Sequence, residues 1–362
     1  MYITMAAAEN TQTTKQKLGQ FMTTNVDNIL QGISIPTGVK TVVEPFCGNG
    51  DLLKIVLPGV AIEKYDIDSK LEGVIKQDTL LNPPNYAGKF VLTNPPYLAR
   101  NKSKDKTLFD KYDTNDLYKC AMLEMLNPDN RPDGGILIVP LNFWSSIRKS
   151  DIDLRRKFMN TFNIVQLNIF EEQVFDDTAY TVCAFLFIAA TENREINIDV
   201  FPSKMNMKVM LSDQNNFTIG GEIYDLPCRG DYTMTRLTTK NATNANNKIL
   251  IKCIDDGPDN QIGLSIADKV YVDETANQSA RSYASVIIKP PLDNDQQAAL
   301  VADVNAFLLA NRDKYHSLFL TNYRESKKNN SRKRISFQLL YKIMEHILDK
   351  QIPANLDQLT IN

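Results

Sequence analysis

The sequence has few of the side chains that bind metal ions. Its 362 residues include two histidines and five cysteines. The cysteines are scattered along the chain without a close pair, at Cys47, Cys120, Cys183, Cys228 and Cys253. Scattered cysteines argue against a zinc site or a disulfide framework, and they are typical of a reducing compartment. Because His316 and His346 are the only imidazoles, we expect chemistry that needs neither a metal ion nor a histidine.

Long apolar runs and a strong net charge are also missing. No apolar run approaches the ~20 residues that cross a bilayer, and residues 1–17 are polar, without the apolar core of a signal peptide. We therefore expect an intracellular protein that has no membrane partner. The formal net charge is −2, so binding to nucleic acid would require a local basic surface.

The first half of the chain alternates apolar, strand-like runs with helical patterns. Strands are predicted at residues 39–46, 60–65, 90–93, 136–140, 164–170 and 180–189, and helices at residues 51–56, 115–126 and 153–162. Strands that alternate with helices favour a mainly parallel sheet covered on both faces. The last two strands are close in sequence, so we expect one of them to run antiparallel at the sheet edge.

The character of the sequence changes after about residue 192. Asparagine and threonine become frequent, the predicted strands are short, and helical patterns return at residues 293–309 and 336–348. We therefore predict an N-terminal tail over residues 1–17, a Rossmann-like α/β domain over residues 18–194, and a smaller α+β domain over residues 195–362.

A glycine-containing motif follows the first predicted strand, at the sheet edge where open α/β folds bind ligands. It reads Glu44-Pro45-Phe46-Cys47-Gly48-Asn49-Gly50. Gly48 and Gly50 can adopt positive φ angles and let the backbone approach a ligand closely. A purely structural turn would have the same sequence, so this motif alone leaves both interpretations open.

Acidic residues end the next two strand-like segments. Asp66 can accept both hydroxyl protons of a ribose. Asp68 either does so instead or caps the following helix. Asp78 is placed to meet an adenine amino group, or it is an ordinary cap or turn residue.

The strongest signal is Asn94-Pro95-Pro96-Tyr97, hereafter the tetrad, which follows an apolar strand. Two consecutive prolines remove two backbone donors and stiffen the turn. The Asn94 side-chain oxygen and the Pro95 carbonyl can then act as paired acceptors, with the flat face of Tyr97 beside them. A structural turn seldom needs this combination, so the tetrad favours a binding site for an amino group.

These motifs and their order resemble the gamma class of N6-adenine DNA methyltransferases, the family of the TaqI methylase. Leu18-Gly19-Gln20-Phe21-Met22-Thr23-Thr24 is similar to the family's opening motif, although Thr24 stands where the family usually has proline. Asn115-Asp116-Leu117-Tyr118 resembles the next helix motif. The resemblance covers about residues 18–190. It implies a Rossmann-like class I methyltransferase sheet, followed by a C-terminal target-recognition domain.

The resemblance implies S-adenosyl-L-methionine as the cofactor. The residues implied to bind it are Phe21, Thr23, Glu44, Phe46, Gly48, Gly50, Asp66, Ile67, Asp78, Thr79 and Asn94. Among them, Thr23 and Glu44 would hold the methionine part, Asp66 the ribose and Asp78 the adenine. Thr79 stands where the family usually has an aromatic residue, so stacking on the cofactor adenine would come from elsewhere.

The residues implied to be catalytic are Asn94, Pro95, Pro96, Tyr97 and Phe175. The two acceptors of Asn94 and Pro95 would bind both amino hydrogens of adenine and draw the nitrogen toward sp³ geometry. Catalysis of this kind acts through positioning and electrostatic preorganisation. An adenine inside a duplex must first be flipped out. Tyr97 and Phe175 would then sandwich the base, or either ring is plain core.

The expected partner is double-stranded DNA with a specific recognition sequence. The sequence leaves open whether a cognate restriction endonuclease is a second partner. Candidate phosphate contacts are Arg324, Lys327, Lys328, Arg332, Lys333 and Arg334. Phosphate contacts set affinity and salt dependence rather than specificity, and the same segment also fits a solvated loop. Asparagine and glutamine residues beyond residue 195 are candidates for reading adenines.

Other functions fit parts of the pattern. Methylation of protein glutamine poses the same chemical problem as methylation of an amine, and methylation of an RNA base is a second alternative. Only about 40 residues precede the glycine motif and about 170 follow the methyltransferase core, which favours DNA by the same resemblance. A catalytically inactive nucleic-acid-binding module on this fold is the non-enzymatic alternative.

Overall fold

The structure is a computed structural model in which the chain forms two compact units. The described residues are 23–172, 174–175, 181–190, 193–255, 261–272, 283–325 and 331–352. Unit 1 comprises Met1–Pro140, Asp153–Phe170 and Val174–Lys208. Unit 2 comprises Leu141–Ile152, Glu171–Gln173 and Val209–Asn362.

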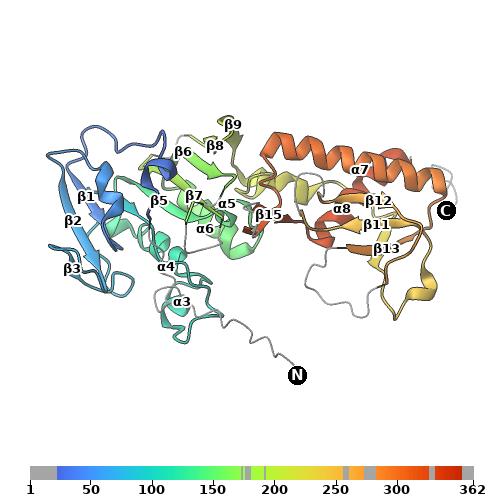
Figure 1. Cartoon of the computed structure of the whole chain (residues 1–362), viewed down its shortest axis with the longest axis horizontal. Helices are drawn as coiled ribbons and strands as arrows, with labels where there is room; N and C mark the ends of the chain where they lie inside the picture. Colours follow the sequence, from blue (N-terminus) through green and yellow to red (C-terminus); the bar gives the residue numbers. More distant parts are fainter. Residues whose placement is uncertain are drawn as a thin grey trace, which may run out of the picture. The chain divides into compact units, whose positions relative to one another are not determined.

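A nine-stranded sheet forms the framework of unit 1 (Figure 1). Its strands are β1 (Thr41–Glu44), β2 (Ala61–Asp66), β3 (Ile75–Lys76), β4 (Phe90–Thr93), β5 (Gly134–Pro140), β6 (Asn163–Phe170), β7 (Val182–Ile188), β8 (Glu195–Phe201) and β9 (Met205–Met210). The strand order is β3-β2-β1-β4-β5-β7-β6-β8-β9. β8 and β9 lie after residue 194 in the chain and continue the same sheet.

The sheet is mostly parallel, which confirms the predicted Rossmann-like α/β architecture. β1 pairs in parallel with β2 and β4, and β5 pairs in parallel with β4. β7 runs antiparallel to both β5 and β6. This is the predicted antiparallel strand, but it lies inside the sheet rather than at the edge, because β5 and β6 pair with its two sides.

Burial differs between the centre and one edge of this sheet. All residues of β4 are buried, as in strands covered on both faces. The edge formed by β2 and β3 leaves Ile62 and Ile75 exposed. The predicted helix at residues 51–56 is only the 3-10 helix η1 (Asp51–Ile55). It cannot extend further because Pro58 disfavours helical geometry at the preceding residue, Leu57.

The two longest α-helices of the described residues belong to unit 2. The α-helices are α2 (Val26–Ile29), α3 (Thr107–Lys111), α4 (Leu117–Glu124), α5 (Asn142–Ser145), α6 (Lys149–Met159), α7 (Asn294–Tyr315) and α8 (Phe337–Gln351). The other 3-10 helices are η2 (Pro128–Asn130), η3 (Asp213–Asn215), η4 (Gly221–Asp225) and η5 (Ala242–Asn244). No helix in the described ranges is both long enough and apolar enough to span a bilayer.

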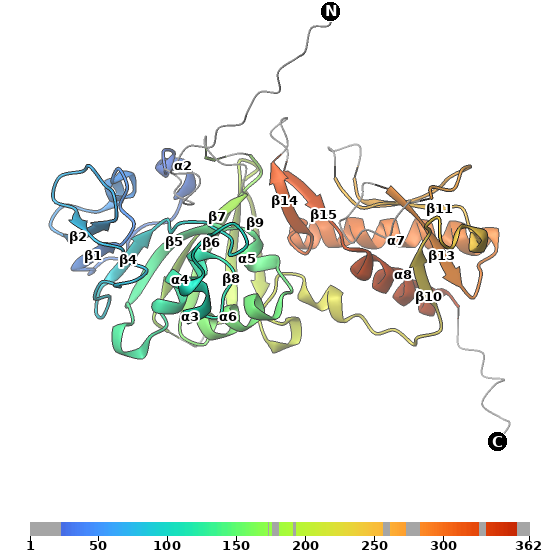
Figure 2. The same cartoon turned by 90° about the horizontal axis from the view of Figure 1, so that it is seen from below.

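Unit 2 has the α+β character expected from its sequence. Its strands are β10 (Thr233–Arg236), β11 (Ile249–Lys252), β12 (Gly263–Ile266), β13 (Tyr283–Lys289), β14 (Thr321–Glu325) and β15 (Ser331–Arg334). The first four form an antiparallel sheet in the order β10-β13-β11-β12, and β14 pairs with β15. Figure 2 shows α7 and α8 beside this sheet, and α7 packs along β12.

Local capping explains where α7 and α8 begin. The Asp293 carboxylate accepts a hydrogen bond from Gln296 N (2.8 Å), and the Gln296 side chain accepts one from Asp293 N (3.0 Å). This capping box satisfies two backbone donors that the helix itself leaves without partners. The Ser336 hydroxyl accepts a hydrogen bond from Leu339 N (3.1 Å) at the start of α8.

Candidate functional site

One cavity of about 450 Å³ collects the segments that follow the first four strands of the chain. Its lining comes from the turns after β1, β2, β3 and β4 and from α3 and α4. The residues are Phe46, Gly48, Asn49, Asp66, Ile67, Asp68, Ser69, Lys70, Gln77, Asp78, Thr79, Leu80, Asn94, Pro96, Leu108 and Leu117. The cavity therefore joins the glycine motif, both acidic strand ends and the tetrad.

The glycine turn is held by the carboxylate of the next strand. Gly48 and Gly50 have φ angles of 52° and 77°, a region that favours glycine. Gly48 N donates to Asp66 Oδ2 (2.8 Å), and Asp68 N donates to Asp66 Oδ1 (2.7 Å). Each carboxylate oxygen can accept more than one hydrogen bond. Asp66 can therefore shape the turn and still accept from a ligand in the cavity.

Asp78 and Thr79 line the cavity and stabilise the turn that follows β3. Asp78 Oδ1 accepts hydrogen bonds from Leu80 N (3.1 Å) and Leu81 N (3.2 Å), so it does cap a turn. The Thr79 hydroxyl donates to the Pro45 carbonyl (2.8 Å) and ties this turn to the glycine motif.

Apolar side chains form much of the cavity wall. Phe46, Ile67, Leu80, Leu108 and Leu117 offer the apolar surface that a flat ring would pack against. Only Phe46 and Ile67 of these were assigned from the sequence. The helix motif at residues 115–118 contains Leu117 and could have indicated it.

Glu44 is a buried acid with one oxygen left without a partner. Its side chain is 1% exposed, and burial raises its pKa to about 8. Oε1 accepts hydrogen bonds from Thr93 Oγ1 (2.7 Å) and Phe46 N (3.2 Å). Oε2 is buried and has no hydrogen-bond partner among the described residues. Because a buried oxygen without a partner costs about 1–3 kcal/mol, this position fits an N–H donor that arrives with a ligand.

Asn94 is held from two sides within unit 1. Its Nδ2 donates to the hydroxyl of buried Thr23 (2.9 Å). The Tyr97 hydroxyl contacts Asn94 Oδ1 and the Ile138 carbonyl oxygen, the latter at 2.8 Å. A hydroxyl has one proton and an amide oxygen accepts two hydrogen bonds, so Asn94 Oδ1 retains capacity to accept from a substrate.

The two predicted stacking aromatics are buried in this structure. Tyr97 is 4% exposed and Phe175 is 1% exposed. The Tyr97 ring meets Tyr118 edge to face, with centroids 6.1 Å apart, and burial raises the pKa of the Tyr97 hydroxyl well above its ordinary value. Stacking of these rings on a base stays a prediction. It requires that the faces of the two buried rings become accessible when a base binds.

Several predicted residues lie outside the part that can be described. Phe21, Lys327 and Lys328 fall outside the described residues. Arg324 and Arg332 belong to β14 and β15, so this basic segment includes strands of a hairpin rather than only a loop.

Lys333 makes contacts within unit 2. It is mostly buried, its Nζ donates to the His316 carbonyl (3.3 Å), and burial lowers its pKa to about 8. Arg334 forms a β-bridge with Ile254. Phosphate contacts by this segment remain a prediction, and Lys333 is the member whose amine is already engaged inside the unit.

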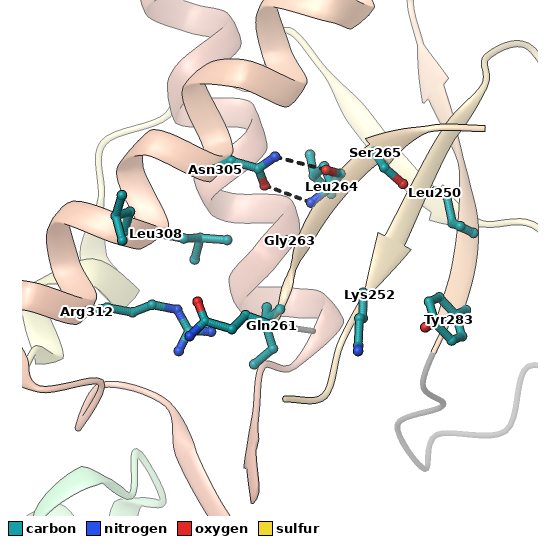
Figure 3. Close-up of a pocket in the computed structure, with 12 residues that line it drawn as sticks. Leu250, Lys252, Gln261, Gly263, Leu264, Ser265, Tyr283, Asn305, Leu308 and Arg312 are labelled. Carbon is teal, nitrogen blue, oxygen red and sulfur yellow. Dashed lines mark hydrogen bonds between the residues drawn. The ribbon is translucent and has the colours of Figure 1, made fainter. Parts of the chain in front are cut away.

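Several asparagines of unit 2 bind backbone groups of their own unit, among them Asn246, Asn247 and Asn305. Asn246 exchanges hydrogen bonds with both backbone groups of Ile288. Asn247 donates to the Val286 carbonyl (2.7 Å) and accepts from Ile249 N (2.9 Å). Asn305 binds both backbone groups of Leu264, at 2.8 and 2.9 Å (Figure 3).

A second cavity, of about 420 Å³, lies beside Asn305 in unit 2 (Figure 3). Lys252 lies with its Nζ 5.7 Å from the centroid of the Tyr283 ring. Arg312 also lines the cavity, but its guanidinium is paired with Asp255 at 2.8 and 3.0 Å. No sequence motif indicated this cavity, because its residues come from segments up to about 60 positions apart.

Unit 2 also brings together three groups that could coordinate a cation. One ligand atom from each of Cys228, Glu345 and Asp349 lies within 4.8 Å of the others. Arg229 N donates to Asp349 Oδ2 (2.6 Å), and the Cys228 thiol contacts the Lys342 carbonyl (3.6 Å).

No family profile matches the sequence, and no curated protein matches it. Among solved structures, a cryo-EM structure of a DrdV–DNA complex is similar with a TM-score of 0.44 and 12% identity, covering 66% of this chain and 35% of that one. The type IIG restriction endonuclease BpuSI has a TM-score of 0.40 and 13% identity, with coverage of 60% and 35%. A modification subunit of a putative type I restriction enzyme from Vibrio vulnificus YJ016 has a TM-score of 0.39 and 14% identity, with coverage of 50% and 47%. The matched region spans less than half of each of these chains.

Proposed function

We propose that this protein is an S-adenosylmethionine-dependent DNA methyltransferase of the gamma class, acting on the N6 amino group of adenine. The observation that carries the proposal is that Asp66 and Asn94 line one cavity. A carboxylate suited to ribose hydroxyls and an amide suited to an amino group therefore meet where parallel strands end. Two reactants held in one cavity can react in an effectively unimolecular step.

The donors and acceptors in and beside this cavity fit the proposed cofactor. The buried Glu44 oxygen without a partner suits the ammonium of the methionine part. Asp66 would accept from the ribose hydroxyls and Asp78 from the adenine amine. Ile67 and Leu117 would pack on the adenine ring. When bound, the cofactor supplies an electrophilic methyl group on its sulfonium sulfur.

The tetrad would orient the substrate amine. Asn94 Oδ1 and the Pro95 carbonyl each accept one amino hydrogen, which pulls the nitrogen lone pair out of conjugation with the ring. Thr23 and Tyr97 hold the Asn94 amide so that little reorientation is needed during reaction. The amino proton leaves after the nitrogen has become positively charged, so no strong base is needed before attack.

Unit 2 would contact the DNA around the target. Adenine must leave the duplex to reach Asn94, and DNA contacts outside the reacting base compensate for the lost stacking and pairing. The cavity beside Lys252 and Tyr283 is a candidate contact, because lysines bind phosphates and aromatic rings stack on bases. A cognate restriction endonuclease would be the biological partner of such an activity.

A labelling experiment tests this function directly. The full chain is incubated with methyl-labelled S-adenosylmethionine and a mixture of genomic DNA, RNA and protein. We expect N6-methyladenine in the DNA digest after nuclease treatment. Label found only in RNA or in protein glutamine would replace the proposed substrate. Absence of cofactor binding, with DNA binding retained, would identify an inactive binding module instead.

A further inference from the structure

The chain between the tetrad and α4 forms a closed loop over residues 98–116, hereafter the post-tetrad loop. Arg100 N donates to the Asn115 carbonyl (2.8 Å), and Leu117 N donates to the Leu98 carbonyl (3.2 Å). These two hydrogen bonds join the beginning and the end of the loop. The base of the loop is thereby fixed to the tetrad on one side and to α4 on the other.

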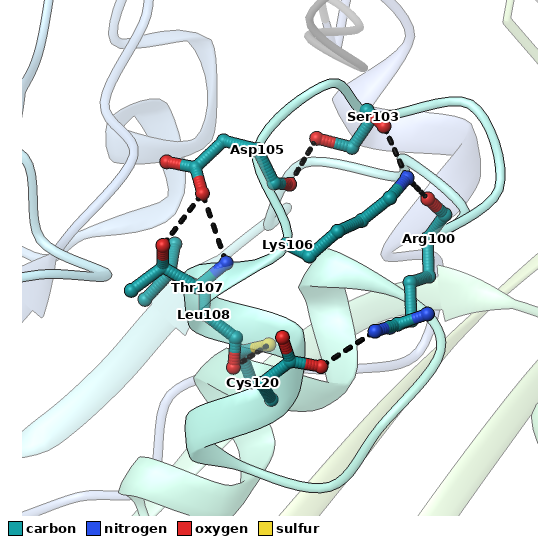
Figure 4. Close-up of polar contacts among 8 residues, drawn as sticks. Arg100, Ser103, Asp105, Lys106, Thr107, Leu108 and Cys120 are labelled. Atoms are coloured by element: carbon teal, nitrogen blue, oxygen red, sulfur yellow. Dashed lines mark hydrogen bonds and ion pairs between the residues drawn. The ribbon is translucent and has the colours of Figure 1, made fainter.

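α3 lies inside the post-tetrad loop and holds Leu108 in place (Figure 4). The Leu108 carbonyl accepts a hydrogen bond from Tyr112 N (3.1 Å), and the Cys120 thiol of α4 contacts the same oxygen (3.9 Å). The neighbouring Phe109 is 2% exposed and anchors α3 in the core. The position of Leu108 is therefore set by contacts within its own helix and with α4.

The turn that leads into α3 is held by its own side chains (Figure 4). The Lys106 amine donates to the carbonyls of Arg100 and Ser103. The Ser103 hydroxyl donates to the Asp105 carbonyl (2.6 Å), and Asp105 Oδ1 accepts from Thr107 N (2.9 Å). Leu108 therefore follows a turn whose shape the protein itself defines.

The Leu108 side chain belongs to an apolar wall of the candidate site. It lines the cavity together with Phe46, Leu80 and Leu117. Leu80 is part of a small buried cluster, and Phe46, Leu108 and Leu117 all pack against that cluster. Because these side chains share one support, they form a continuous apolar surface along the cavity.

The polar group beside this apolar wall is the Asp78 carboxylate. Asp78 lines the same cavity, and its Oδ1 accepts a hydrogen bond from Leu80 N (3.1 Å). The carboxylate and the wall therefore meet at one turn. Each carboxylate oxygen can accept more than one hydrogen bond, so Asp78 can also accept from a ligand. A flat ring that carries an amino group fits this combination, with its face on the wall and its amine at Asp78.

We propose that Leu108 covers the adenine ring of the bound cofactor and determines how tightly the site holds the adenosine part. This inference rests on the proposed function and assigns a cofactor contact to the post-tetrad loop. The contact is favourable because packing an apolar side chain on a ring removes apolar surface from water. The segment that begins at the substrate acceptors is thereby also part of the cofactor site.

The test is a calorimetric titration of the full chain and of Leu108→Ala with two ligands, S-adenosylmethionine and adenosine. Leu108 is half-buried, and the substitution removes three of its carbon atoms. Each buried methylene contributes roughly a fourfold factor in affinity, so we expect both ligands to bind about tenfold more weakly. A loss for S-adenosylmethionine alone would place Leu108 at the methionine part and overturn the inference, because adenosine lacks that part.

Two further variants separate the contact from a general loss of stability. Leu123→Ala makes the same change at a half-buried leucine of α4 that does not line the cavity. We expect it to bind both ligands like the wild type, and Tm reports the stability of each variant. Leu108→Met keeps the apolar volume and should keep both affinities within a few-fold. An equal loss in Leu123→Ala and Leu108→Ala would overturn the inference.

Hydrogen exchange of the wild-type protein is a test that does not depend on whether Leu108→Ala folds. A ligand that packs on Leu108 stabilises α3 against local opening. Saturating S-adenosylmethionine should therefore slow amide exchange over residues 107–112. The peptide that covers α7 is the internal reference, because α7 contributes no residue to this cavity. Unchanged exchange over residues 107–112 would contradict the proposed contact.

The outcomes also distinguish this inference from the proposed function. If the wild-type protein methylates DNA and Leu108→Ala binds both ligands like the wild type, the Leu108 assignment is wrong and the function stands. If the wild-type protein binds the cofactor but methylates only RNA or protein, the DNA substrate is wrong and the Leu108 contact stands. If the wild-type protein binds neither S-adenosylmethionine nor adenosine, both proposals fail.

Discussion

Polar side chains of unit 1 converge on a cavity, whereas amides of unit 2 bind the backbone of their own unit. Asp66 and Asn94 come from different strands and line one space. Asn246, Asn247 and Asn305 each hydrogen-bond backbone groups in the second sheet. The difference teaches that residue type alone does not locate a recognition surface. An amide is available to read a base only when its donor and acceptor are not already held.

The largest expected effect concerns the cavity side of this comparison. Asn94→Ala removes one of the two proposed acceptors, and we expect kcat to fall by at least about a hundredfold, as when one preorganised polar group is lost from an active site. Cofactor affinity should stay within a few-fold, because Asn94 is only one of many residues implied to bind the cofactor. Single-turnover methyl transfer and cofactor titration measure both. Asn94→Asp, which keeps an acceptor oxygen, should lose less, and near-normal turnover in Asn94→Ala would refute the assigned role.

The next prediction concerns the internal polar contacts of unit 2. Asp255→Ala leaves Arg312 buried without its bidentate partner, since these side chains are 11% and 9% exposed. Breaking such a pair costs about 3–5 kcal/mol. We expect unit 2 to unfold at a lower temperature while cofactor binding by unit 1 persists. Thermal unfolding followed with and without cofactor is the measurement.

A matched control for Asp255→Ala lies in unit 1. Asp153 pairs with Arg156 at 3.2 Å, and both side chains are more than a third exposed. Asp153→Ala should change stability by less than about 1 kcal/mol. A loss of cofactor binding in Asp255→Ala at the temperature where unit 2 unfolds would contradict the prediction that unit 1 keeps its cofactor site when unit 2 is destabilised.

A smaller effect is expected at the ribose end of the cavity. Asp66→Ala removes hydrogen bonds to a charged group, each of which contributes roughly 1.5–3 kcal/mol. We expect cofactor binding to weaken by about ten- to a hundredfold in calorimetric titration. Asp68→Ala is the control, because its carboxylate is exposed while Asp66 carries the bonds to Gly48 and to Asp68 N. Equal losses in both variants would mean that Asp68 shares the role.

The smallest effect is a pH dependence of cofactor binding at Glu44. With its pKa raised to about 8 by burial, Glu44 is mostly protonated at pH 7. The cationic ammonium of the cofactor favours the ionised form, so ionisation of Glu44 should strengthen binding. The ionised fraction increases from about a tenth at pH 7 to about nine tenths at pH 9.

Glu44→Gln removes the titrating carboxyl group, while the ligand ammonium titrates near pH ~8 in both measurements. Because the ion pair needs both charges, the ratio of wild-type to Glu44→Gln affinity should rise from about pH 6 to about pH 8 and fall again by about pH 9. A ratio that is constant across this range would show that Glu44 does not meet the ammonium. The measurement is a cofactor titration at each pH, with both proteins in the same buffers.

Much of the framework of unit 1 could be predicted because local patterns determine it. β4 has the bounds expected from its apolar run, Phe90–Thr93. The antiparallel strand was expected from two strands close in sequence, but its place inside the sheet depends on its pairing with β5, which is distant in sequence. The predicted helix after the glycine turn is only η1, since Pro58 follows too soon.

The contacts that could not be predicted join residues far apart in the chain. Asn305 meets Leu264 across 41 positions, and Asp255 meets Arg312 across 57. The sequence around Asn305 or Arg312 contains no pattern that predicts a contact with a residue so far away in the chain. The same holds for Lys106, whose amine binds carbonyls of its own loop although its sequence neighbours suggest only a basic surface segment.

The Asn305 amide has a consequence for how molecules of this protein meet in concentrated solution. β12 is the last strand of its sheet, and Leu264 would present its outward N–H and C=O to any foreign strand. Both groups are already occupied by a side chain of α7. An open strand edge is a template for aggregation. At Leu264 of the folded unit, a single side chain of α7 therefore closes this edge to pairing with a foreign strand.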